Sequence, residues 1–82
     1  MEKQQNLLDS IDRLHTTDLG KIRIRENLKL DLEDPMESCR QIIQRPDCTV
    51  SRKGKNWYCE SENIRITIHA RSFTIITARR IR

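Results

Sequence analysis

The sequence is poor in glycine and in long apolar runs, and each shortage excludes a class of protein. Two glycines, Gly20 and Gly54, cannot form the glycine-rich loop that cradles phosphate groups in nucleotide-binding enzymes. No apolar run approaches the length of about 20 residues that a membrane-spanning helix needs. The chain of 82 residues is also too short for a dinucleotide-binding α/β fold or a TIM barrel. What remains is a small protein without a large enzyme scaffold.

The composition supports one domain, residues 1–82, with a thin core. Hydrophobic residues make up 35% of the chain and charged residues 34%, whereas average proteins have about 45–50% and about 25%. The aromatic side chains are only Trp57, Tyr58 and Phe73, so aliphatic residues must fill the core. A chain of this size buries about 60–65% of its unfolded surface, which is enough for two packed layers.

The cysteines and the first residues indicate a reduced, intracellular protein. Cys39, Cys48 and Cys59 are odd in number and far apart. This spacing fits neither a disulfide framework nor the Cys-x-x-Cys pairs of a zinc site. We therefore expect free thiols, no metal and no cofactor. Residues 1–6 are polar and form no signal peptide, so we expect a cytoplasmic protein that does not associate with membranes.

Helical spacing of apolar residues predicts three helices within residues 4–46. The first covers about residues 4–14 and carries the apolar positions Leu7, Leu8, Ile11 and Leu14. The second begins after an N-cap at Thr16 or Thr17. Its expected buried residues are Leu19, Ile22 and Ile24. Asn27 tolerates left-handed backbone and is the expected end of this second helix.

The third helix has the clearest start. We expect Asp34 as its N-cap, Pro35 at its first helical position and Glu37 in its first turn. This combination is typical of helix N-termini, because the N–H that proline lacks has no helical partner there. The expected buried face comprises Met36, Cys39, Ile42 and Ile43. Pro46 ends the helix.

From Cys48 onward the apolar period changes to two, which predicts β-strands. Four strands are expected, at about residues 48–52, 56–59, 64–70 and 73–79. The turns between them are short, and short turns join antiparallel neighbours. The predicted fold is therefore α+β, with three N-terminal helices packed on a four-stranded antiparallel β-meander, residues 48–80.

The register of the last hairpin decides which side chains share a face of the sheet. We expect a two-residue loop at Arg71–Ser72, which sets Ile68 opposite Ile75. The same register sets Ile66 opposite Thr77. One face is then apolar and suited to the helices. The other face is polar and cationic and carries Arg65, Thr67, His69, Thr74 and Arg80.

Positive charge is concentrated in the predicted sheet. Residues 1–47 hold 8 Lys/Arg and 10 Asp/Glu, a net charge of −2, whereas residues 48–82 hold 8 Lys/Arg and 2 Asp/Glu, a net charge of +6. This asymmetry is typical of a protein that binds RNA, single-stranded nucleic acid or an acidic protein partner. It also arises when Lys and Arg merely solvate the exposed face of a small sheet. The candidate nucleic-acid-binding residues are Arg52, Lys53, Lys55, Arg65, His69 and Arg80.

Two histidines and several arginines provide the groups for RNA cleavage without a metal. Histidine, with a reference pKa of about 6.5, can accept the proton of the attacking 2′-hydroxyl or donate one to the leaving oxygen. Arginine stabilises charge in the transition state. The candidate catalytic residues are His15, Arg23, Thr77 and Arg79. We expect them to meet at one edge of the sheet. The competing interpretation is structural, with His15 capping a helix and His69 facing solvent.

Three segments of the chain match a recurring pattern. His15–Leu28 reads His-Thr-Thr-x-Leu-Gly-x-x-Arg-Ile-x-x-Asn-Leu, and later matches are Arg52–Tyr58 and Ser72–Ala78. On these segments the chain resembles a family of short bacterial proteins of unknown function. It departs from that family at His69, where asparagine is usual, at Phe73, where tyrosine is usual, and at Arg79, where histidine is common.

The order of elements carries a second resemblance. Helices bearing a histidine and an arginine, followed by a four-stranded meander, are similar to the barnase–EndoU–colicin–RelE-like superfamily of small ribonucleases. This resemblance implies a toxin-like ribonuclease with an antitoxin as partner, in which His15, Arg23 and Thr77 matter most. The alternatives are a non-catalytic nucleic-acid-binding or phage-related inhibitory module, and a small interaction protein that docks an acidic partner.

Overall fold

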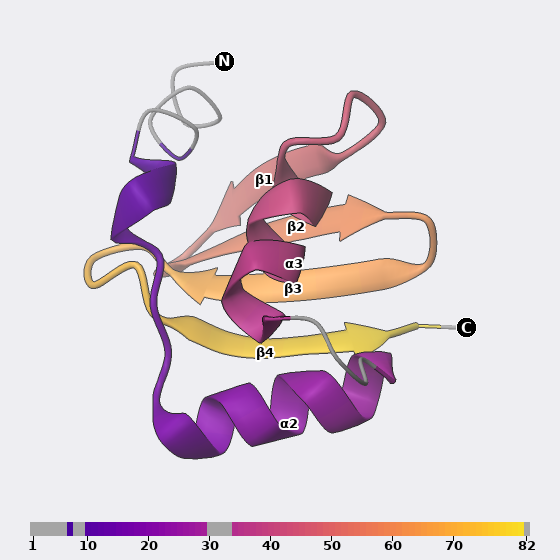
Figure 1. Cartoon of the computed structure of the whole chain (residues 1–82). Helices are drawn as coiled ribbons and strands as arrows, with labels where there is room; N and C mark the ends of the chain where they lie inside the picture. Colours follow the sequence, from indigo (N-terminus) through magenta and orange to yellow (C-terminus); the bar gives the residue numbers. More distant parts are fainter. Residues whose placement is uncertain (1–6, 8–9, 30–33, 82) are drawn as a thin grey trace.

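The computed structural model describes Leu7 and residues 10–29 and 34–81. The elements follow in the order η1 (Ile11–Arg13), α2 (Asp18–Leu28), α3 (Pro35–Ile43), β1 (Thr49–Lys53), β2 (Asn56–Ser61), β3 (Ile64–His69) and β4 (Ile75–Arg80). The fold is α+β, as predicted: the four strands form one antiparallel sheet in the order β1-β2-β3-β4. Helix α3 lies across one face of this meander, and α2 runs alongside β4 at its edge (Figure 1).

Among the described residues there are two helices, α2 and α3, and a lone 3-10 turn, so the structure confirms two of the three predicted helices. Residues 1–6 and 8–9 of the expected first helix lie outside the described residues. Its described part includes Leu7, which is helical and buried, and the single turn η1, in which the Leu14 amide donates to the Ile11 carbonyl at 3.2 Å. At Leu14 the backbone becomes extended, with ψ 136°. The reason is tertiary, because the next residue, His15, pairs with the sheet and cannot remain helical.

Helix α2 begins as predicted but buries a different face. Thr17 is its N-cap and accepts a hydrogen bond from the Gly20 amide at 3.0 Å. Ile24 and Leu28, one turn apart, are buried. The expected burial of Leu19 and Ile22 is wrong, since they are 56% and 51% exposed. A helix lying along one edge strand buries only one narrow face, and these two residues lie on the opposite one.

The second helix also ends later than predicted. Asn27 is still helical, and the left-handed residue after the helix is Lys29, with φ 59°. The Asn27 side chain instead donates from Nδ2 to the carbonyl oxygen of Ala78 at 3.3 Å. Asn27 therefore ties α2 to β4 rather than terminating the helix.

Helix α3 has the N-terminus and the buried face that the sequence predicts. Asp34 is the N-cap and accepts from the Met36 amide at 2.9 Å, with Pro35 at the first helical position. The buried face includes Met36, Cys39, Ile42 and Ile43, as expected. The largest fully buried side chains come from both layers of the protein: Leu7, Ile24, Leu28, Ile66, Ile68, Cys39 and Cys59.

The last hairpin follows the predicted register at its closed end and departs from it further along. Ile68 does pair with Ile75, but Ile66 pairs with Ala78 instead of Thr77. A β-bulge opposite the Thr67–Ile68 step inserts Ile76, which is 52% exposed. The extra residue shifts every later side chain of β4 to the other face. Thus Arg79 lies opposite Arg65, and Arg79 rather than Arg80 shares its face of the sheet.

The loop of this hairpin is also longer than predicted. The His69 amide donates to the Thr74 carbonyl and the Phe73 amide to the His69 carbonyl, both at 2.8 Å. Four residues, Ala70 to Phe73, therefore separate the paired positions instead of two. Phe73 takes left-handed backbone, with φ 60°, as the last residue of such a loop often does.

Candidate functional site

Three separate segments meet at the end of the sheet where β3 turns into β4. The β1–β2 turn contacts the β3–β4 loop, since the Ala70 amide donates to the Lys55 carbonyl at 2.8 Å. The chain between η1 and α2 crosses the same end of the sheet (Figure 1). There His15 forms a parallel bridge with Thr74, and the Ile75 amide donates to the His15 carbonyl at 2.8 Å. This arrangement, here called the histidine end, brings both histidines of the chain to one place.

A chain of two hydroxyl groups connects the two histidines. His15 Nε2 lies 3.0 Å from Thr74 Oγ1, and Thr74 Oγ1 lies 2.8 Å from Ser72 Oγ. Ser72 Oγ in turn lies 3.4 Å from His69 Nδ1. We call this series the hydroxyl chain. Because each hydroxyl group can both donate and accept, the chain can link the two rings through consecutive hydrogen bonds.

The hydrogen bonds around each ring define where its proton lies in the neutral form. His15 Nδ1 lies 2.9 Å from the Arg13 carbonyl, which can only accept, so Nδ1 carries the proton and Nε2 accepts from Thr74. His69 Nδ1 accepts from the backbone amides of Arg71 at 3.3 Å and Ser72 at 3.4 Å. The proton of neutral His69 therefore lies on Nε2, which is left as a donor.

A stack of cationic and aromatic side chains holds the loop in position. The Phe73 ring lies 5.1 Å from the Trp57 ring, centroid to centroid. The Arg13 guanidinium lies 4.6 Å from the Phe73 centroid, and the Arg52 guanidinium 5.6 Å from the Trp57 centroid. A non-glycine residue in left-handed backbone costs about 1–2 kcal/mol. An aromatic pair or a cation–π contact contributes about 0.5–1.5 kcal/mol, so these contacts offset the strain at Phe73.

Cationic side chains from the end of β1, the β1–β2 turn and the β3–β4 loop line a cavity at this end of the sheet. The cavity has a volume of about 320 Å³ and is lined by Arg52, Lys55, His69, Ala70 and Arg71. We call it the basic pocket. Within the described part of the chain, ion pairs join Arg40 to Glu37, Arg45 to Glu62 and Arg65 to Glu60. None of them involves a cation of the basic pocket, so its positive charge is not balanced by a described carboxylate.

The predicted nucleic-acid-binding residues separate into two groups. Arg52, Lys55 and His69 meet at the basic pocket. Arg65 pairs with Glu60 at 2.7 Å, and this carboxylate neutralises it. Lys53 lies with Glu60 and Arg65 on another cavity, lined also by Ser51, Gly54 and Tyr58.

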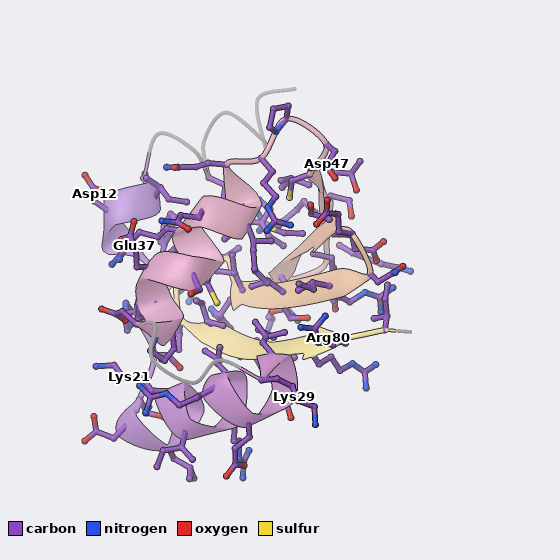
Figure 2. All side chains as sticks on the ribbon, turned by 45° about the vertical axis from the view of Figure 1, so that its right-hand side comes forward. Asp12, Lys21, Lys29, Glu37, Asp47 and Arg80 are labelled. Carbon is purple, nitrogen blue, oxygen red and sulfur yellow. The ribbon has the colours of Figure 1, made fainter. Side chains whose placement is uncertain are left out.

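Arg80 does not lie on the outer face with Arg65, which corrects the predicted face. Its Nη2 donates to the Leu28 carbonyl at 3.1 Å and so caps α2, near Lys29 in Figure 2. The bulge at Ile76 is the physical reason, because it turns Arg80 toward the helix. Arg71 was missed as a pocket residue, and its position beside His69 in the hairpin loop was the signal that could have identified it.

The predicted catalytic residues are not gathered around His15. His15 bonds to Thr74, whereas Thr77 lies three residues further along β4, about 10 Å away at the rise of a β-strand. Arg79 lies beyond Thr77 and opposite Arg65, and Arg23 is exposed on α2. The structure instead places Thr74, Ser72 and His69 next to His15. The bridge joins positions 59 residues apart, a contact for which the sequence contains no periodic signal.

The three thiols are free, as predicted, and all three are buried. Burial raises the pKa of Cys39 to about 12. A hydrogen bond between the thiols of Cys48 and Cys59 lowers the pKa of Cys48 and raises that of Cys59. Among the described residues there is no group of three or more His, Cys, Asp and Glu that could hold a metal ion. No described helix is long and apolar enough to cross a membrane.

The comparisons with other proteins identify a family and no activity. The model of a family described as "Protein of unknown function (DUF3781)" matches residues 8–79. This confirms the resemblance to a family of unknown function. No curated protein and no solved structure matches the chain.

Proposed function

We propose that this chain, which belongs to the DUF3781 family, is an RNA-binding protein that holds phosphate groups at the basic pocket. The observation that carries the proposal is the pocket itself, in which Arg52, Lys55 and Arg71 surround one cavity and form no ion pair with a described carboxylate. Unbalanced cations on a small basic protein attract polyanions, whose condensed counterions are released on binding.

The shape of the site favours single-stranded RNA over a double helix. Proteins read RNA mainly at single strands, loops and ends, whose bases stack on arginine and histidine planes. The basic pocket offers such planes at Arg52, Arg71 and His69. It lies at the end of the sheet, where a flexible strand can enter it.

Metal-independent RNA cleavage is the second candidate function, and one observation favours it. His69 lies on the wall of the pocket and is joined through the hydroxyl chain to His15. In this reaction the 2′-oxygen attacks the adjacent phosphorus and loses its proton to solvent. His69 Nε2 donates a proton to the leaving 5′-oxygen, and a 2′,3′-cyclic phosphate remains.

As His69 Nε2 gives its proton to the leaving oxygen, His69 Nδ1 takes one from protonated His15 through the hydroxyl chain, so the His69 ring stays neutral. Protonated His15 donates from Nε2 to Thr74, Thr74 donates to Ser72, and Ser72 donates to His69 Nδ1. Each step moves one proton along a hydrogen bond of the hydroxyl chain. Exchange with solvent then returns a proton to Nε2 and to His15. Under this second candidate function, the protein would be a toxin-like ribonuclease similar to the barnase–EndoU–colicin–RelE-like proteins.

One experiment tests both candidate functions. Labelled total RNA is incubated with the purified protein at several ionic strengths, in the presence of a metal chelator. We expect binding that weakens with salt. The double variant Lys55→Ala/Arg71→Ala should flatten the salt dependence by about two phosphate contacts. The matched control is Lys21→Ala/Arg25→Ala, which removes the same charge from exposed positions of α2.

Each outcome has a defined meaning. Equal loss of binding in both double variants would show that net charge, and not the pocket, determines RNA binding. No RNA binding at low salt would refute the proposal and favour an acidic protein partner. New cyclic-phosphate ends on the RNA would support cleavage. RNA that is bound but stays intact would indicate a protein that binds RNA without cleaving it.

A further inference from the structure

The polar side-chain groups that line the basic pocket are hydrogen-bond donors. Arginine and lysine side chains donate only, and these are Arg52, Lys55 and Arg71. His69 uses Nδ1 to accept from the loop amides, so its free ring nitrogen, Nε2, carries a proton. The ligand that fits this lining has several oxygen atoms that accept hydrogen bonds and needs no hydrogen-bond donor of its own.

The number of charges distinguishes between the possible anions. Three full positive charges line one cavity of about 320 Å³. A carboxylate or an internal phosphodiester brings one negative charge. A phosphomonoester brings about −1.5 to −2 at pH 7 and three acceptor oxygens. A terminal phosphate therefore matches the charge and the donors of the pocket better than either alternative.

The geometry of Arg52 supports recognition of one well-placed phosphate. Its Nε donates to the Gly54 carbonyl at 3.0 Å, and its guanidinium lies 5.6 Å from the Trp57 centroid. These contacts orient the planar fork, whose terminal nitrogens can make paired hydrogen bonds to a phosphate. The volume of the cavity lies at the small end of the range of about 300–1,000 Å³ for ligand sites, which suits a single nucleotide.

We infer that the basic pocket binds a nucleotide phosphomonoester through Arg52, Lys55 and Arg71, with His69 as a further donor. Two sources carry this group, namely the phosphorylated end of an RNA strand and a free nucleoside monophosphate. For the first source the inference rests on the proposed RNA binding. If the ligand is a free nucleoside monophosphate, the inference does not depend on RNA binding.

Binding of short labelled RNA to the full chain tests the inference. The probes are one single-stranded octanucleotide with a 5′-phosphate, with a 3′-phosphate or with hydroxyl groups at both ends, together with adenosine monophosphate and adenosine. We expect one phosphorylated end to bind about tenfold or more tightly than the hydroxyl ends, as one or two charge-assisted hydrogen bonds provide. Arg71→Gln should abolish this preference, and Arg25→Gln, on exposed α2, should keep it.

The outcomes separate this inference from the proposed function. Equal affinity for all three octanucleotides, together with equal affinity for adenosine monophosphate and adenosine, would overturn the inference and leave RNA binding intact. Binding of adenosine monophosphate over adenosine, without binding of any RNA, would uphold the pocket and refute the proposed function. No binding of any probe would overturn both. Lys55→Gln repeats the test independently, and circular dichroism verifies that each variant is folded.

Discussion

His15 and Thr74 are joined twice, once through their backbones and once through their side chains. The parallel bridge fixes the two backbones side by side, and His15 Nε2 then lies 3.0 Å from Thr74 Oγ1. Because the backbone bonds already hold the two residues in place, the side-chain bond requires little further ordering. A histidine from the helical region thereby becomes part of the sheet.

Replacing Thr74 by valine should remove the central link of the hydroxyl chain while keeping a β-branched side chain for the strand. We expect the free energy of unfolding to fall by about 1 kcal/mol, the usual loss for one such hydrogen bond. Urea denaturation measures it. Thr74→Ser retains the hydroxyl and should keep most of the stability, and equal losses in both variants would argue against the hydrogen bond.

The role of the histidines is tested by His69→Ala and His15→Ala. In a metal-independent ribonuclease, His69→Ala should lower the cleavage rate by about 10²–10⁴-fold. His15→Ala should also slow cleavage and change its pH profile, because His15 supplies the proton that His69 Nδ1 takes up as Nε2 donates. The backbone bonds of His15 do not involve its ring, so this variant should fold. A folded His15→Ala protein that cleaves at the parent rate would refute its catalytic role.

Gly20→Ala should destabilise the protein, although alanine is the better helix former by about 1 kcal/mol. A Cβ at this position would collide with Oγ1 of Thr16, the hydroxyl that donates to the Ile75 carbonyl at 3.1 Å. The collision would push the segment before α2 away from β4. Thermal melts measure the loss. In a Thr16→Ala background the penalty of Gly20→Ala should shrink, and an unchanged penalty would locate the strain elsewhere.

Stability should fall at alkaline pH because of Cys39. Its pKa is about 12 in the folded protein and 9.0 for an unperturbed thiol. Between these values the folded state retains a proton that the unfolded state has lost, so the free energy of unfolding decreases as pH rises from about 9 to 12. Urea denaturation at pH 7, 9 and 10 should show a steeper fall for the parent than for Cys39→Ala. Parallel slopes would contradict the prediction.

Local signals in the sequence were sufficient for the elements that depend on neighbouring residues. Asp34 and Pro35 define the start of α3, because capping and a preset φ act within one turn. The alternation from Cys48 onward predicted the four antiparallel strands, since each strand buries one face on the same layer. The basic character of the sheet region was likewise visible from composition alone.

Tertiary packing decided the features that bring the candidate site together. The inserted Ile76 changes the face of every later residue of β4, and this moved Arg80 from the expected outer face to the end of α2. The bridge between His15 and Thr74 ended the first helical pattern and created the hydroxyl chain. Both depend on contacts between residues far apart in the chain, and periodicity, which reports only on a residue's near neighbours, carries no information about them.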